Sequence, residues 1–201
     1  YTYGTNGLKV DIPRIVNYID KEIMKGDIAE AKLFNPDFII ANMHWGLEYE
    51  RIPSREQREL ADWLLRQGVD LVIGSHPHVV QPMELRRGKE GVTDRLVVYS
   101  LGNFISNMSR EHTDGGVMVK VVLGRKGLRR YIISAQYSLI YSSRYKNEQG
   151  KEDIRVVPAA SWSGKNQNSS FSVDSALIKY VNNTRLFLKG NNKEVEEYIF
   201  E

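Results

Sequence analysis

The stretches FIIANMHWG (residues 38–46) and VDLVIGSHPH (residues 69–78) decide the fold that this sequence predicts. Each begins with a short run of mostly apolar residues, which is typical of a strand buried on both faces, and then passes into polar residues and histidine. Residues 54–68 between them begin with a capping-box pattern, carry an apolar stripe at helical spacing and end at a glycine, which predicts a helix. Strand, helix and strand over residues 38–74 make a right-handed βαβ unit, so both strands should end at the same edge of a parallel sheet.

Periodicity predicts the remaining elements, and together they indicate an α/β fold. A helix precedes the first strand, and residues 117–157 are expected to form an antiparallel meander. No internal repeat and no linker divides the chain, so we expect one domain over residues 1–201. Residues 16–20 are expected to form a short strand or, alternatively, the start of a helix, and residues 21–34 a helix. The other expected elements are strands over 38–41 and 69–74, a hairpin at 88–91, a strand over 96–100 and a loop at 161–172. C-terminal helices are expected within 174–200, over 174–188 with Asp174 as N-cap and over 193–200.

Composition excludes several classes of protein. The chain has 201 residues, of which 41% are hydrophobic and 26% charged, as in an ordinary globular domain with a packed core. Its longest apolar runs, of about half a dozen residues, are far short of the ~20 that a membrane-spanning helix needs, and residues 1–20 show no basic-then-apolar signal pattern. The net charge of +3 is too small to favour nucleic acid as a partner, although a pI near 9.0 suits an anionic substrate.

Three of the four histidines follow the predicted strands. His44 comes after the first strand, and His76 and His78 come after the second, so all three should lie at the edge where open α/β sheets bind ligands. Neutral imidazole is a common ligand for zinc, manganese or iron, and the absence of cysteine leaves only histidine and oxygen ligands. Three histidines at one edge favour a site for one ion, or part of a two-ion site. The alternative is a histidine that caps a strand and a solvated His-Pro-His turn.

Several motifs resemble those of one family. HWGLEY (residues 44–49), VIGSHPHVVQ (residues 72–81) followed by Glu84, and YSLGNF (residues 99–104) have the order and form found in the CapA family of capsule synthesis proteins. The opening segment YTYGTNG (residues 1–7) also resembles a mid-chain element of that family. Members are associated with making or exporting poly-γ-glutamate, so the resemblance implies a role in capsule biosynthesis.

The resemblance implies a calcineurin-like metallophosphoesterase fold. In that fold two sheets stack between helices as a four-layer α/β/β/α sandwich, and this chain would form the C-terminal part, with its core motifs at residues 38–106. His44, His76 and His78 match metal-ligating histidines of the superfamily, and the implied cofactors are divalent ions of Mn, Zn, Fe or Mg. The upstream Asp-x-His, Gly-Asp and Gly-Asn-His elements have no match here, so two ions are expected only when an N-terminal portion is present.

Other residues near these motifs have two possible roles each. His44 and Glu48 are the candidate catalytic residues, Glu48 as an acid or as a group that orients a histidine, unless it is simply an exposed loop residue. Asn103 either lines the site and contacts substrate or hydrogen-bonds the loop. Trp45 is either a packing residue or a platform for substrate. His112 lies in a predicted loop and is not expected to be a ligand.

Three functional interpretations remain open. The first is a metal-dependent hydrolase of phosphoesters or amides, acting on an anionic envelope polymer or on a substrate unrelated to capsule. The second is a non-catalytic polymer-binding or accessory protein of capsule assembly, and the third is a fold that keeps no occupied site. The missing upstream carboxylates weigh against turnover by this chain alone, because neutral imidazoles do not offset the charge of two cations.

Two further expectations concern partners and location. An incomplete fold should expose one edge of its central sheet, so we expect an N-terminal fragment of the same protein or a second copy of the chain to pair there. An extracytoplasmic or membrane-associated location is implied by the resemblance alone.

Overall fold

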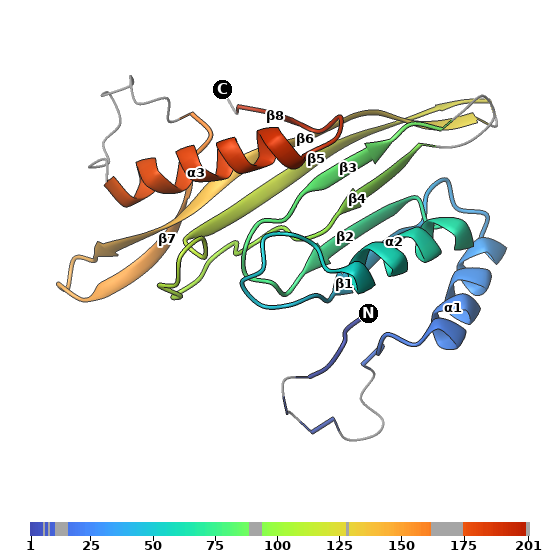
Figure 1. The fold of residues 1–201 in the computed structure, drawn as a ribbon, viewed down its shortest axis with the longest axis horizontal. Helices are drawn as coiled ribbons and strands as arrows, with labels where there is room; N and C mark the ends of the chain where they lie inside the picture. Colours follow the sequence, from blue (N-terminus) through green and yellow to red (C-terminus); the bar gives the residue numbers. More distant parts are fainter. Residues whose placement is uncertain are drawn as a thin grey trace.

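Two β-sheets and three helices form the part of the chain that the computed structural model describes (Figure 1). No helix within that part is both long and apolar enough to cross a membrane. The combination of sheets and helices confirms the predicted α/β class. The predicted hairpin tip, most of the predicted loop at 161–172 and the predicted N-cap Asp174 lie outside the described residues. The described residues are 1–5, 7, 9–10, 16–88, 94–127, 129–161 and 175–199.

The first sheet contains both motifs that decide the fold. Its strands are β1 (Ile40–His44), β2 (Leu71–Ser75), β3 (Met83–Arg86) and β4 (Arg95–Val98). They lie in the order β1-β2-β4-β3, with β1, β2 and β4 parallel and β3 antiparallel to β4. His44 at the end of β1 pairs in register with Ser75 at the end of β2. The predicted βαβ unit is therefore confirmed.

Helix α2 (Arg55–Gln67), which connects β1 to β2, follows its sequence signals closely. The Ser54 hydroxyl accepts from the N–H of Gln57, and the Ser54 N–H donates to the Gln57 side chain, so the capping box is complete. Gly68 ends the helix at a φ of 97°, a left-handed conformation that a residue with a Cβ adopts only under strain. Local signals were sufficient to place this helix.

Strand β1 lies further along the chain than predicted. The sequence predicted residues 38–41, whereas the observed strand takes in His44 as its last residue. At its start, the N–H of Ile39 donates to the Asp70 carboxylate at 2.8 Å instead of to a neighbouring strand. At its end, the His44 N–H donates to the carbonyl of Tyr1 at 2.7 Å, so the opening segment extends the pairing. His44 is therefore held on a strand and not on a loop.

Helices α1 (Lys21–Leu33) and α2 pack on one face of the first sheet. Asp20 caps α1 by accepting from two N–H groups of its first turn. The strand predicted over 16–20 is wrong, because among the described residues Tyr18 makes a single bridge, with Thr2, whereas Asp20 serves as this cap and so agrees with the alternative of a helix start. Alternate strand residues point into the core beneath the helices. The buried residues of this core are Met24, Ile28, Ala41, Met43, Trp45, Ala61, Leu64, Val69, Val72, Val97 and Tyr99.

The second sheet confirms the meander predicted at 117–157. Its elements, with the helix beside it, are β5 (Gly115–Lys126), β6 (Arg129–Lys146), β7 (Glu152–Pro158), α3 (Ser175–Asn191) and β8 (Glu196–Glu197). β5, β6 and β7 pair antiparallel in that order, and the short β8 pairs parallel with β6. A single core joins this sheet to the first sheet and to α3, including Leu71, Met83, Leu96, Val98, Val117, Ile132, Leu139, Tyr141, Leu177, Tyr180 and Leu188.

The C-terminal segment differs from its prediction. The sequence predicted a helix over 193–200, but the described residues contain a bridge at Lys193 and the two-residue β8. The Lys193 N–H donates to the Met83 carbonyl, and its carbonyl accepts from the Leu85 N–H, both at 2.9 Å. These bonds satisfy backbone groups at the outer edge of β3, which a helix would leave unpaired.

The free sheet edge expected from the sequence is present only in part. β1 is an outer strand, and the Tyr1 amino group donates to the Asn42 carbonyl at 2.6 Å along its outer side. Thr2 bridges His44 on the same side. Ile40 at the start of β1 remains 53% exposed. Pairing of an N-terminal fragment or a second copy at this edge stays a prediction.

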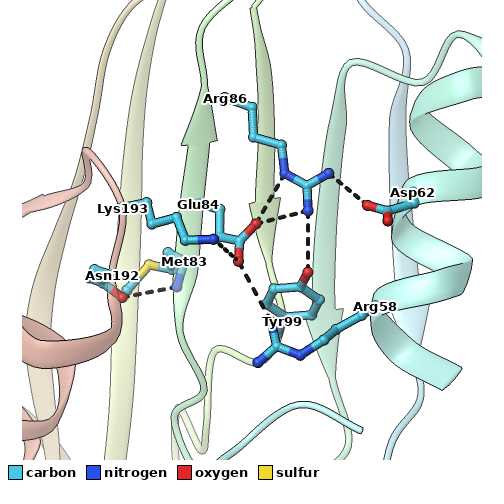
Figure 2. Close-up of polar contacts among 8 residues, drawn as sticks. All are labelled: Arg58, Asp62, Met83, Glu84, Arg86, Tyr99, Asn192 and Lys193. Carbon is cyan, nitrogen blue, oxygen red and sulfur yellow. Dashed lines mark hydrogen bonds and ion pairs between the residues drawn. The ribbon is translucent and has the colours of Figure 1, made fainter. Parts of the chain in front are cut away.

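A buried carboxylate ties three parts of the fold together (Figure 2). Glu84 on β3 is 4% exposed and accepts from Arg86 at 2.8 and 3.0 Å and from Lys193 at 3.1 Å. Arg86 also donates to Asp62 on α2 at 2.7 Å, and Arg58 of the same helix lies 3.7 Å from Glu84. The network therefore links α2, β3 and the segment that follows α3.

The electrostatic balance at Glu84 favours the charged form. Burial raises its pKa, but the hydrogen bonds from Arg86 and Lys193 outweigh burial, so the pKa lies below the ordinary value. A carboxyl with a lowered pKa stabilises the fold above its unfolded-state pKa, and this contribution is lost as the pH falls through the folded-state value.

We predict that Glu84→Gln lowers the free energy of unfolding by about 3 kcal/mol at pH 7, since the cations around it lose their buried counter-charge. Urea unfolding followed by circular dichroism measures this loss. The deficit should be full above about pH 4.3 and should shrink at lower pH, where the wild-type carboxyl is protonated as well. Glu59→Gln, which removes an exposed pair with Arg55, is the control and should cost less than about 1 kcal/mol. Equal losses in the two variants would contradict the role of Glu84.

Candidate metal centre

The segments that end β1 and β2 bring three histidines together. The ring centroids of His44 and His76 lie 4.6 Å apart, and those of His76 and His78 lie 6.0 Å apart. This grouping follows from the register of the two strands, which end level with each other. The structure thus places the predicted histidines at one sheet edge.

Glu48 completes a group of side chains that can hold a metal ion. Glu48, His76 and His78 each offer one ligand atom, and these atoms all lie within 4.8 Å of one another. Two imidazoles and a carboxylate form a nitrogen and oxygen donor set that suits zinc, manganese or iron. The loop that carries Glu48 is held by a bond from the Tyr49 N–H to the Pro77 carbonyl at 2.8 Å. The sequence analysis left Glu48 as an acid, a group that orients a histidine or an exposed loop residue, and did not predict it as a ligand, because this long-range bond leaves no local pattern.

His76 is the most buried member of the group. His76 is 7% exposed, and its Nδ1 is buried without a hydrogen-bond partner among the described residues. A buried nitrogen without a partner is costly, and most such atoms in native proteins bind another group. A metal ion is one such group, and His76 belongs with Glu48 and His78 to the residues that can hold one. The residues present therefore fit a divalent metal ion.

The protonation state of two histidines suits metal binding. Burial lowers the pKa of His44, and the nearby His78 lowers it further. Burial also lowers the pKa of His76, with a smaller contribution from His44 in the same direction and an opposing one from Glu48. Both imidazoles thus favour the neutral form, which is the form that binds a metal.

Asn103 sets the tautomer of His78. The Asn103 Nδ2 donates to the carbonyl of Thr113 at 2.9 Å, so its Oδ1 faces His78 as an acceptor. The Nδ1 of His78 lies 3.0 Å from that Oδ1 and must carry the proton. The Nε2 of His78 is left with a lone pair for an ion. Asn103 thus lines the site and hydrogen-bonds the loop with one amide, and its contact with substrate stays a prediction.

The turns of the site have a strained backbone. His76, His78 and Tyr49 have φ values of 104°, 61° and 67°, in the left-handed region that residues with a Cβ rarely adopt. Such conformations cost about 1–3 kcal/mol each and cluster at functional sites. Gly74, just before the turn, has no room for a side chain, since a Cβ there would lie 2.0 Å from the Tyr99 carbonyl oxygen. The close approach of β2 to the end of β4 therefore requires glycine.

Tyr3 is a site residue that the sequence did not single out. Its ring lies 5.7 Å from the His44 ring, nearly parallel to it at 3°, and 4.4 Å from the His76 ring. The Tyr3 N–H donates to the His44 carbonyl at 3.0 Å, which fixes the tyrosine beside the cluster. The only signal in the sequence was the opening segment's resemblance to a family element.

Comparison with known proteins identifies the family. The family model described as "Bacterial capsule synthesis protein PGA_cap" matches residues 2–108, more than half of the chain. The chain belongs to the bacterial capsule synthesis protein family. This confirms the resemblance on which the sequence analysis relied.

Two curated relatives carry capsule-related names. The PGA biosynthesis protein CapA of Bacillus subtilis (strain 168) is 34% identical over 115 residues, which are 57% of this chain and 28% of that protein. The capsule biosynthesis protein CapA of Bacillus anthracis is 35% identical over 107 residues, 53% of this chain and 24% of that protein. The chain therefore spans only about a quarter of the length of these relatives.

The family match contains the candidate metal centre. Its residues 2–108 include Tyr3, both histidine motifs and Asn103, but end before the second sheet. His112 lies beyond the match and outside the metal-binding group of the described residues. Its pKa is lowered by burial, with the nearby Arg51 acting in the same direction.

Trp45 lies in the hydrophobic core next to the candidate metal centre. Trp45 is 2% exposed, and its indole Nε1 donates to the Tyr99 carbonyl at 2.9 Å. These contacts support the packing role that the sequence left open. A role in substrate binding has no contact to support it among the described residues and stays a prediction.

We predict that Asn103→Ala weakens divalent metal binding by about 10–100-fold, because His78 loses the acceptor that fixes its tautomer. Calorimetric titration with Zn²⁺ or Mn²⁺ measures the affinity. Asn107→Ala is the matched control, since Asn107 lies in the same loop and its side chain binds Arg144 instead of a histidine. Equal affinities for Asn103→Ala and the wild type would overturn the assigned role of Asn103.

Proposed function

We propose that this chain acts in capsule biosynthesis, binding a divalent metal ion and acting on an anionic envelope polymer such as poly-γ-glutamate. The single observation that carries the proposal is the group of Glu48, His76 and His78, in which the Nδ1 of His76 is buried without a hydrogen-bond partner among the described residues. The choice of polymer is supported by the names of the two relatives, one a PGA biosynthesis protein and the other a capsule biosynthesis protein. Such a role agrees with an extracytoplasmic or membrane-associated location.

The site residues divide the work between holding the ion and supporting it. Glu48, His76 and His78 would hold the ion, which would supply Lewis-acid polarisation of a phosphoryl or carbonyl oxygen. In the neutral His78 imidazole, Asn103 holds the proton on Nδ1, so that Nε2 presents the lone pair. One carboxylate offsets only half of the charge of a divalent ion, so the loaded site would attract an anionic ligand.

A non-catalytic role in capsule assembly is the second candidate. Within the described residues, Glu48 is the one carboxylate of the metal-binding group, and it is exposed to solvent. A second ion would need further anionic ligands to offset its charge. This favours metal and polymer binding without turnover when the chain acts alone.

The test compares the wild type with His76→Ala, and uses His112→Ala as a control because His112 lies outside the group. Equilibrium dialysis with Zn²⁺ or Mn²⁺ should detect about one ion per chain in the wild type and the control. His76→Ala should lose at least about tenfold in affinity, since one of three ligands is removed. In the native cells, the same substitution should abolish surface polymer, whereas His112→Ala should not.

The outcomes separate the two candidates. Metal-dependent hydrolysis of a generic phosphodiester or a γ-glutamyl oligomer would support the enzyme. Metal and oligomer binding without hydrolysis would support the accessory role. Absence of metal binding by the wild type, together with normal surface polymer in the His76→Ala cells, would contradict both.

A further inference from the structure

The geometry points to Arg110 as a subsite for an oxyanion, the carboxylate or phosphate group of an anionic polymer, next to the histidine cluster. The inference rests on the proposed function and deepens it, since it assigns a residue to the recognition of that polymer. Arg110 lies beyond the family match and was not singled out by the sequence.

Arg110 is stacked on a ring that is itself fixed to the site. Its guanidinium carbon lies 4.0 Å from the centroid of the Tyr49 ring. The Tyr49 ring in turn stacks on His78, with centroids 6.1 Å apart and planes 27° from parallel. The Tyr49 N–H donates to the carbonyl of Pro77, between His76 and His78. The Tyr49 ring thus contacts both the guanidinium of Arg110 and the imidazole of His78, a candidate metal ligand.

The stack leaves the hydrogen-bonding groups of Arg110 unused. Stacking occupies the face of a guanidinium, whereas its five N–H donors point outward in the plane. The described residues provide no ion-pair partner for Arg110, and the adjacent Glu111 instead lies 3.7 Å from Lys179. Arg110 is also exposed to solvent. An oriented and uncompensated guanidinium beside a cluster of ligands is a receptor for an oxyanion.

The loop that carries Arg110 is fastened at several points. The carbonyl of Arg110 accepts from both the N–H and the hydroxyl of Thr113, at 3.1 and 2.6 Å. Arg144 donates to the side chain and the carbonyl of Asn107, both at 2.8 Å. The base of the loop is closed by Asn103, which also binds His78. The position of Arg110 relative to the histidines is therefore set by the fold, which lowers the entropic cost of binding.

The spacing suits a ligand with repeated charges. The guanidinium and the His78 ring lie on the Tyr49 stack at separations of 4.0 and 6.1 Å from its centroid, so a single small anion does not need to reach both. A polymer with one charged group at the histidine cluster can place a neighbouring group on Arg110. Arg110 and His78 can be no farther apart than these two distances added together, which is comparable with the screening length of ~8–10 Å in physiological salt, so both groups act on the same ligand.

The experiment measures anion and metal binding separately in the wild type, Arg110→Gln and Lys120→Gln. Lys120 on β5 is the matched control, because its ammonium also lies over an aromatic ring, 4.5 Å from the centroid of the Tyr198 ring. The probes are a γ-linked glutamate oligomer, inorganic phosphate and Mn²⁺, each titrated by calorimetry at low and high salt. Arg110→Gln should bind the oligomer at least about tenfold more weakly and lose part of the salt dependence. Mn²⁺ affinity should stay within about twofold, and Lys120→Gln should match the wild type throughout.

The two anions distinguish the source of the charge. Loss of oligomer binding alone assigns the subsite to carboxylates, and loss of phosphate binding alone assigns it to phosphoester groups. Unchanged affinity of Arg110→Gln for both anions, with normal Mn²⁺ binding, would overturn the subsite and leave the proposed metal centre intact. Failure of the wild type to bind Mn²⁺, with the Arg110 effect on the oligomer preserved, would instead overturn the metal centre and retain the subsite.

Discussion

The parallel register of β1 and β2 is the constraint on which the rest of the site depends. Because His44 is level with Ser75, the turns after the two strands leave the sheet side by side. A slip of one residue would move each side chain to the opposite face of the sheet. Burial of Met43 and Val72 under α1 and α2 opposes such a slip. The alternation of buried and exposed side chains along β1 and β2 therefore also determines the positions of the histidines.

The second sheet contributes to the site through Asn103. The Asn103 N–H donates to the Gly115 carbonyl at the start of β5, and Gly102 bridges Gly116. The amide that fixes His78 is thus anchored where the two sheets meet. The core shared by both sheets and α3 keeps that junction in place and helps to maintain the strained turn at His76 and His78. Metal-site geometry and the packing of the sheets are consequently coupled.

Local signals predicted the elements that local contacts create. The capping box at Ser54 and the glycine at the end of α2 were sufficient for that helix, and the topology of a βαβ unit was sufficient to bring the histidines to one edge. The helix predicted for the C-terminal segment was wrong, because Lys193 pairs with Glu84 on β3, which lies 109 residues earlier in the chain. Local periodicity carries no information about such long-range pairing.

The site was predicted in part for the same reason. The histidines follow strands and were found by that pattern, whereas the position of Glu48 depends on a bond between two loops. The place of Tyr3 on the cluster depends on pairing between the opening segment and β1. Trp45 is adjacent to His44 in sequence, but strand alternation turns it into the core.

The central claim is that Glu48, His76 and His78 hold one divalent ion. Crystals grown with Zn²⁺ and measured on both sides of its absorption edge test it directly. One anomalous peak is expected, at about 2.0–2.2 Å from a nitrogen of His76, a nitrogen of His78 and the Glu48 carboxylate. A zinc-containing crystal with no peak at this group, or with the ion bound elsewhere while the Nδ1 of His76 stays unpartnered, would contradict it.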